Sequence, residues 1–370
     1  MTDYYYSDGA GAKRKKEGSF VLRIVDFVML LLSVAALGLL LLTLITSHVA
    51  PSVSWIFAIV GLITPAIYLL AIIMALYWII RWRWIYASLF LVPLAIGAPA
   101  VSRYYKIETS KKYGELPRRG VMRLMSYNVK YLIDQEGQYS TPAMNIFIDQ
   151  VKPDVVCFQE FTPRHMSQSE EPETFSNYSS AKITGMAIYS RYKILESSEN
   201  LISEDFDSGR AFWADLLVGR DTIRLYNLHL HSTAITLNDD QYLSKMEFLG
   251  DSLSDDKLKG IISRFKATSI GRAAQADSLA ANIAKSPHRV IVCGDFNDTP
   301  NSYAYRRISN GLQDAFQESG LGYSHTFCGF LNLLRIDYVL VEKPLEVLSY
   351  EVVDSVKLSD HLPVVTTLKL

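Results

Sequence analysis

Hydrophobic and polar positions divide this chain of 370 residues at about residue 102. Before that point, segments 27–45, 55–80 and 85–101 carry no charged residue. A hydrocarbon core of about 30 Å needs roughly 20 apolar residues in a helix, so two of these segments are long enough to cross it and the third is near the lower limit. The pattern predicts a membrane anchor in residues 1–101 with three transmembrane helices.

Two alternatives compete with this interpretation. The first segment resembles a signal peptide because basic residues 13–16 precede it, but its apolar core is too long and two further apolar segments follow. The segments are also compatible with buried core helices. Tryptophans near the segment ends favour the membrane, since this side chain concentrates at the interface. These residues are Trp55, Trp78, Trp82 and Trp84.

Basic residues predict the orientation of the anchor. With three spans, residues 13–16 would lie on the same side of the membrane as Arg81 and Arg83. The positive-inside rule predicts that this side is the cytoplasmic one. Three spans then place everything after residue 101 outside the cytoplasm. The segment 102–119 is expected to be a juxtamembrane linker. Its basic residues favour the opposite orientation, with this segment in the cytoplasm, or else lie on anionic headgroups.

Residues 120–370 suit one large domain. Apolar runs typical of strands alternate here with segments whose apolar residues have helical spacing, such as 269–284. Such mixed chains favour an α+β fold of two sheets packed face to face with helices outside. Without residues 1–101 the chain is mildly acidic, unlike most proteins that bind duplex DNA. Three cysteines in no metal-type spacing form no disulfide framework.

Polar side chains stand at the ends of the apolar runs. The run 290–293 ends in Gly294, and Asp295 and Asn297 then point to the same side of an extended chain. Each such residue alone is compatible with a plain turn, a solvated strand edge or a buried structural histidine. Their repeated position makes an accident less plausible. The other candidates are Asn128, Glu160, His229, Asp337, Asp360 and His361.

These motifs, in this order, resemble the endonuclease/exonuclease/phosphatase superfamily, whose members include DNase I-like nucleases, abasic-site endonucleases, neutral sphingomyelinases and inositol polyphosphate 5-phosphatases. The resemblance covers residues 120–370 and implies a four-layered α/β/β/α sandwich, here preceded by the three expected spans. The motifs are Ser126-Tyr-Asn128-Val, Phe158-Gln159-Glu160, Asn227-Leu-His229-Leu, Gly294-Asp295-Phe-Asn297, Arg335-Ile-Asp337-Tyr and Ser359-Asp360-His361.

The resemblance also implies roles for these residues. Glu160 would be the main ligand of Mg²⁺, with Mn²⁺ as the other candidate, and Asn128 and Asp360 would assist it. Asp295 would orient or deprotonate water, and Asn297 and His229 would donate to phosphoryl oxygens. Asp337 would pair with His361. Asn128 would also contact the phosphate.

The implied reaction is hydrolysis of a phosphodiester by in-line attack of water, in a nucleic acid or a phospholipid head group. A phosphomonoesterase of the inositol-phosphate type and an inactive binding module of the same fold are the alternatives. The expected partners are this phosphoester and the lipid bilayer. The sequence leaves open the general base, the number of metal ions and the oligomeric state.

Two departures bear on substrate and location. Lys130 stands where some abasic-site nucleases carry an acidic residue, and the insertion 233–268 has amphipathic spacing that fits either a lid, a lipid-facing surface or an inert surface helix. Asn297-Asp-Thr299 is a glycosylation sequon whose use would block the site. The expected location is therefore a bacterial inner membrane, with the catalytic domain outside the cytoplasm.

Overall fold

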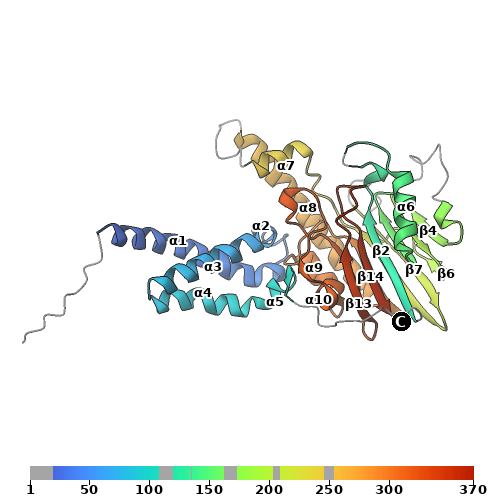
Figure 1. Ribbon diagram of the computed structural model, residues 1–370, viewed down its shortest axis with the longest axis horizontal. Coiled ribbons are helices and arrows are strands. Elements are labelled where there is room, and N and C mark those ends of the chain that lie inside the picture. The colour runs from blue at the N-terminus through green and yellow to red at the C-terminus, as the bar shows by residue number, and fades with distance from the viewer. Residues whose placement is uncertain (1–19, 108–119, 135, 162–172, 203–208, 246–253) are drawn as a thin grey trace, which may run out of the picture.

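The computed structural model describes residues 20–107, 120–134, 136–161, 173–202, 209–245 and 254–370. N-terminal helices form one end of the molecule and a two-sheet domain forms the other (Figure 1). The basic residues 13–16 and segment 108–119 of the expected linker lie outside the described residues, as does segment 246–253 of the insertion.

Two six-stranded sheets make up the domain. Each has one parallel pair at its centre, β8/β9 in the first and β2/β3 in the second, flanked by antiparallel neighbours, so both sheets are mixed. The first sheet runs in the order β10 (Gln313–Asp314), β12 (Asp337–Val341), β9 (Arg289–Asp295), β8 (Asp221–His229), β7 (Arg210–Val218), β6 (Lys193–Ser197). The second runs β13 (Glu346–Val352), β14 (Val364–Lys369), β2 (Val121–Asn128), β3 (Val155–Gln159), β5 (Met186–Ser190), β4 (Ser179–Ile183).

The sheets pack face to face, and helices cover their outer faces. Apolar side chains from both inner faces form the central core, including Leu124, Cys157, Leu225 and Cys293. Helix α6 (Thr141–Val151) covers the second sheet. Helices α8 (Ser254–Ile283) and α9 (Tyr303–Ile308) cover the first. The expected α+β sandwich is therefore confirmed, and consecutive apolar positions in central strands such as β3, β9 and β12 bury both of their faces.

The expectation of three transmembrane helices is wrong. Only one described helix is long and apolar enough to cross a membrane, the stretch Phe20–His48 that contains α1 (Phe20–Ile45), or two if a bent pair counts as one span. That pair, α2 (Ile56–Leu62) and α3 (Thr64–Ile80), bends by 70°. Pro65 lies in the first turn of α3, where it has no N–H to continue the hydrogen bonds of α2.

The third expected span is too short. Helix α4 (Trp84–Ile96) has 13 residues, about 20 Å at 1.5 Å per residue, and ends at Gly97 before the single turn α5 (Ala98–Val101). Helices α1, α3 and α4 nevertheless share an apolar core around Leu40, Ala71 and Phe90. Many other apolar side chains of these helices are exposed, so the bundle has an apolar exterior.

The bundle packs directly on the loop that follows β9. The Thr299 hydroxyl donates to the Gly61 carbonyl oxygen over 3.1 Å, and the Asn301 amide donates to the Thr43 carbonyl oxygen and the Thr64 hydroxyl, each over 3.1 Å. A Cβ at Gly61 would lie only 3.0 Å from the Asn301 carbonyl oxygen, so this close approach favours glycine. The strand β1 (Tyr105–Lys106) then pairs with β11 (Gly322–Tyr323).

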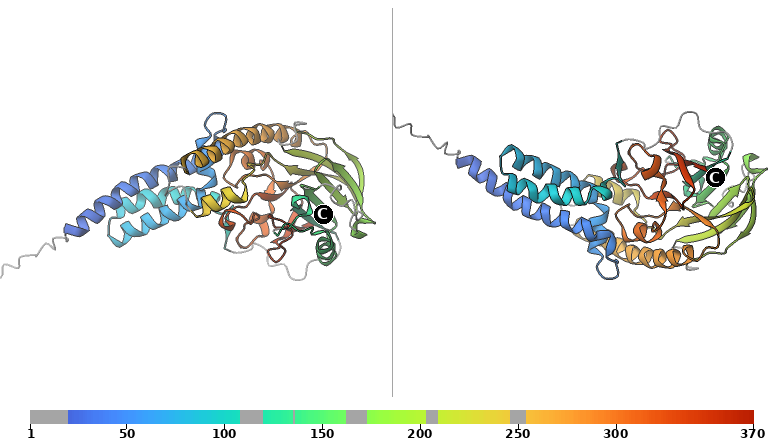
Figure 2. Two further views of the ribbon diagram at one scale, coloured as in Figure 1. Left: turned by 90° about the horizontal axis from the view of Figure 1, so that it is seen from above. Right: turned by 90° about the horizontal axis from the view of Figure 1, so that it is seen from below.

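The insertion consists of α7 (Leu237–Ser244) and the first half of α8. Helix α8 is longer than the predicted helix 269–284 and continues towards the bundle along the outside of the domain (Figure 2). Its Lys266 ammonium lies 5.7 Å from the centre of the Trp55 ring. One continuous helix therefore joins the outer face of the first sheet to the N-terminal helices. The short helix α10 (Ala315–Ser319) follows β10.

We expect Arg335→Met to destabilise the protein by about 3–5 kcal/mol, because it removes one partner of a buried ion pair. The Arg335 guanidinium is fully buried and donates to both carboxylate oxygens of Asp314, over 2.7 and 3.1 Å. Arg289→Met is the control, since its 3.3 Å pair with Asp221 is solvent-exposed and should contribute little. Thermal unfolding of both variants in the same detergent measures the difference, and equal melting temperatures would contradict it.

Candidate functional site

The register of the first sheet places three candidate residues in one row. His229, at the end of β8, pairs with Asp295 at the end of β9, and Asp295 pairs with Asp337 at the start of β12. Gly294 is required in this row. Its φ is +130°, and a Cβ there would overlap the Leu228 carbonyl oxygen.

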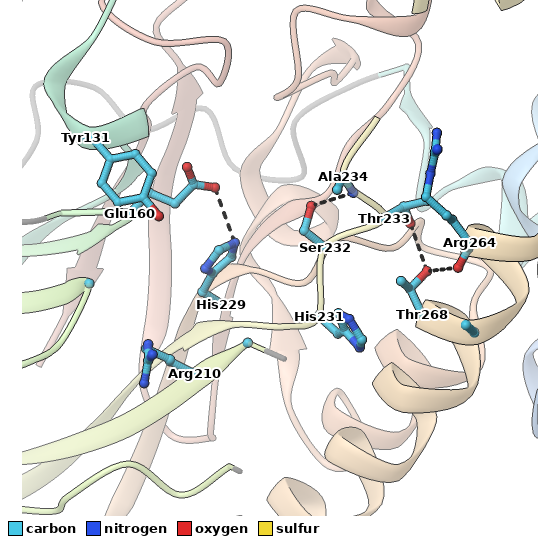
Figure 3. A pocket seen from close by; sticks show the side chains of 13 residues that line it. Tyr131, Glu160, Arg210, His229, His231, Ser232, Thr233, Ala234, Arg264 and Thr268 are labelled. Carbon is cyan, nitrogen blue, oxygen red and sulfur yellow. Dashed lines mark hydrogen bonds and ion pairs between the residues drawn. The ribbon is translucent and has the colours of Figure 1, made fainter. Parts of the chain in front are cut away.

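The second sheet contributes Asn128 and Glu160 from the ends of its parallel pair. The Asn128 amide nitrogen donates to Glu160 Oε1 over 3.1 Å and to Asp295 Oδ2 over 3.0 Å. It therefore connects one carboxylate from each sheet. The nearby His229 Nε2 lies 3.5 Å from Glu160 Oε1 and 3.7 Å from Asp295 Oδ2 (Figure 3 shows the contact with Glu160).

His361 completes the cluster from the loop before β14. Its Nδ1 lies 2.9 Å from Asp337 Oδ2, while its Nε2 lies 3.7 Å from Asp295 Oδ2. The Thr326 hydroxyl accepts from the Asp337 N–H over 3.0 Å, and the Phe327 ring stands edge-on to the His361 ring. Asp337 and His361, which were predicted to pair, lie within hydrogen-bond distance of each other.

Burial and neighbouring charges shift the pKa values in this cluster. Burial raises the pKa of Asp295, and the charge of Asp337 adds to this, whereas His361 and His229 act in the opposite direction. For His361, burial by itself lowers the pKa, but the charges of Asp337 and Asp295 and the hydrogen bond to Asp337 raise it to about 10. The imidazole is therefore protonated at neutral pH.

Backbone conformation sets the position of two of these residues. Glu160 has φ +48° and Asn297 has φ +50°, in the left-handed region that non-glycine residues seldom adopt. At Asn297 the turn lets the backbone N–H donate to Asp295 Oδ1 over 2.8 Å. The Asn297 amide uses its hydrogens on the Leu230 carbonyl oxygen and on Asp295 Oδ2, over 3.0 and 3.2 Å. In this arrangement Asn297 holds Asp295, and its donation to a phosphate remains a prediction.

Asp360 lies beside the cluster and is paired with Lys130. The Lys130 ammonium is 2.7 Å from Asp360 Oδ2, so the departure noted at position 130 neutralises this carboxylate. The expected role of Asp360 as a metal ligand remains a prediction.

Sequence reasoning missed a buried polar link behind the site. The Gln159 amide donates to Asn227 Oδ1 over 2.7 Å, and the Asn227 amide donates to the carbonyl oxygens of Phe158 and Ala187, over 3.0 and 3.1 Å. Both side chains are fully buried between the sheets. Each stands in an apolar strand, Gln159 directly before Glu160 and Asn227 two residues before His229, and that position was the available signal.

Two cavities open on the site and share Glu160 and residues 232–234. The polar cavity, about 510 Å³, is lined by Glu160, Arg210, His229, His231 and Arg264, among others (Figure 3). The apolar cavity, about 480 Å³, is bordered by Glu160, Asn297, Asp360 and His361 at the site. Its remaining walls are mainly apolar and come from the N-terminal helices, the insertion and the loop 327–336.

The donors of the cluster fit a divalent cation. Ligand atoms of Asp295, Asp337 and His361 lie within 4.8 Å of one another. The Glu160 side chain is 23% exposed and lines both cavities, and a second carboxylate, Asp295, reaches the same Asn128 amide. His229 Nε2, buried near both carboxylates, has no hydrogen-bond partner in the part of the chain that is described. An oxygen-rich, partly hydrated position of this kind suits Mg²⁺.

The sequence profile of the Endonuclease/Exonuclease/phosphatase family matches residues 125–361, and a profile described as a domain of unknown function matches residues 26–104. No curated protein matches the chain. Similar solved structures include an endonuclease/exonuclease/phosphatase from Bacteroides vulgatus, with 19% identity, TM-score 0.49, and 68% of this chain and 99% of that one covered. The human Nocturnin catalytic domain has 18% identity, TM-score 0.47, and coverage of 68% and 96%. The mannosyl-6-phosphatase Bt3783 of Bacteroides thetaiotaomicron has 17% identity, TM-score 0.47, and coverage of 67% and 100%.

We expect an imidazole NMR titration of the protein to give His361 a pKa near 10, and Asp337→Asn to lower it, because burial opposes the charged ring once the partner charge is lost. Asp360→Asn, which removes a weaker charge interaction, should lower it less. Since the folded pKa exceeds the ordinary value of 6.5, this group stabilises the fold fully below about pH 6.5, and the contribution is lost as pH rises through about 10. An unchanged pKa in Asp337→Asn would contradict the pairing.

Proposed function

The chain belongs to the endonuclease/exonuclease/phosphatase family, and on this basis we propose that it is a Mg²⁺-dependent phosphoesterase that hydrolyses a phosphodiester. The observation that carries the proposal is the convergence of Glu160, Asn128 and Asp295 from the two sheets, beside a protonated His361. This arrangement combines a cation-binding carboxylate, a candidate base and a fixed positive charge.

Glu160 would hold the cation, assisted by the Asn128 oxygen, which already accepts from the Lys130 N–H over 3.1 Å. When bound, the cation would neutralise negative charge on the phosphoryl oxygens. Mn²⁺ has a similar preference for oxygen donors and is the alternative ion. Asp360 would act on this side of the site through its pair with Lys130.

Asp295 is the general base in this proposal. Its raised pKa makes it more basic than an ordinary carboxylate, and three N–H groups from Asn297 and Asn128 fix its orientation. It would accept a proton from the attacking water. His361, kept protonated by Asp337, and His229 would donate to the oxygens of the phosphoryl group as their negative charge grows.

The apolar helix α1 would anchor this enzyme in a membrane. It is long enough to span one, and most of its apolar side chains face outward. With α1 as a single span and the basic residues 13–16 on its cytoplasmic side, the proposed location is the bacterial inner membrane, with the catalytic domain outside the cytoplasm. A reporter fused after Leu370 that is active only in the cytoplasm would contradict this orientation.

We expect Glu160→Gln to reduce kcat on bis(4-nitrophenyl) phosphate at least about a hundredfold and to weaken Mg²⁺ binding, because the neutral amide is a poorer ligand for a hard cation. Release of 4-nitrophenol by the full-length protein in detergent measures the first effect, and calorimetric titration with Mg²⁺ measures the second.

Glu351→Gln, on the exposed side of β13, is the matched control and should keep wild-type values. EDTA should abolish wild-type turnover, and added Mg²⁺ should restore it. Full activity of Glu160→Gln, or of the wild type in EDTA, would overturn the assignment of the metal site.

A further inference from the structure

We propose that the phosphodiester substrate is carried on an apolar chain, and that the N-terminal helices and the insertion form the binding site of this chain. The inference rests on the proposed function and specifies its substrate class. Its basis is the apolar cavity of about 480 Å³ that begins at Glu160, Asn297 and His361.

Two parts of the chain that lie outside the two-sheet domain supply much of the apolar wall of the cavity. Ile59, Leu62 and Ile63 come from α2 and the bend before α3. Leu258, Ile262 and Phe265 come from the part of α8 that extends beyond the sheet. An apolar lining of this extent offers few polar partners to a nucleotide or a sugar phosphate, whereas it would bind an alkyl chain by removing it from water.

The wall from the N-terminal helices is held in place by buried hydrogen bonds. Thr299 and Asn301, both nearly inaccessible to solvent, bind the Gly61 and Thr43 carbonyl oxygens and Thr64 just after the site residue Asn297. Arg103 also donates to the Pro300 carbonyl oxygen over 3.2 Å. The bend between α2 and α3 therefore has a defined position relative to the cluster, as a binding wall needs.

The polar cavity supplies the other half of an amphiphile site. It shares Glu160 and Ser232–Ala234 with the apolar cavity, and Arg210 and His231 line it (Figure 3). A phosphodiester at Glu160 would thus have a polar cavity for one substituent and an apolar cavity for the other. Exposed apolar side chains on α1 would place this site beside the membrane from which such a substrate comes.

The test compares two soluble phosphodiesters with the same scissile bond, methyl and hexyl 4-nitrophenyl phosphate. In each, water adds to phosphorus and 4-nitrophenolate leaves, so only the alkyl group differs. With full-length protein, Mg²⁺ and minimal detergent, kcat/KM should be at least about tenfold higher for the hexyl ester, since a buried methylene contributes up to about fourfold. Ile63→Asn and Ile262→Asn, on opposite walls, should each reduce this preference several-fold.

Leu195→Asn, at a half-exposed position on β6, is the control and should keep the wild-type preference. A second measurement needs no turnover: in EDTA, hexylphosphonate should raise the melting temperature of the wild type more than methylphosphonate does, and this difference should shrink in Ile63→Asn. Because Ile63 is 36% exposed, its replacement should leave folding intact.

The outcomes separate the two proposals. Turnover of both esters at equal kcat/KM would overturn the apolar-chain site and leave the phosphodiesterase intact. No turnover of either ester by folded, Mg²⁺-loaded protein would overturn the proposed function, and the phosphonate comparison would then decide the binding site alone. An undiminished hexyl preference in both wall variants would show that the preference arises elsewhere and would overturn the proposed cavity.

Discussion

The Asn128 side chain makes the contact on which the site depends, because its amide donates to one carboxylate from each sheet. Two carboxylates held this close repel each other unless donors or cations lie between them. The amide, the two histidines and the backbone N–H of Asn297 supply those donors. The Gln159–Asn227 link repeats the connection one layer deeper. The site is therefore assembled by the same contacts that pack the two sheets together.

The N-terminal helices pack against the candidate site and also carry many exposed apolar side chains. Their contact with the loop 299–301 buries hydrogen bonds that would be costly to leave unmade. Helix α8 reaches the same helices from the outer face of the first sheet. These two connections, the hydrogen bonds to the loop 299–301 and the contact with α8, hold the bundle against the site. They also give the cavity between them defined walls.

Much of the site was predictable because strand ends have a strong local signature. Asn128, Glu160, His229 and Asp295 each end an apolar run, and the expected two-sheet sandwich formed around those runs. The three-span prediction failed because it considered only the length of each apolar segment. Pro65 and Gly97 interrupt these segments and end helices that the apolar composition alone would continue. Arg335 and Gln159 belong to the quoted motifs, but their contacts were not predicted because the partners, Asp314 and Asn227, are distant in the chain.

By itself the sequence determined the family, the alternating strands and the identity of the polar strand ends, since these depend on local periodicity and on residue type. Only the tertiary structure decided which of these side chains touch. It paired Asp360 with Lys130 and turned the Asn297 amide towards Asp295. It also placed Ile63 and Ile262 on one cavity. Such contacts join residues far apart in the chain, so they follow from how the sheets and helices pack and have no local signature.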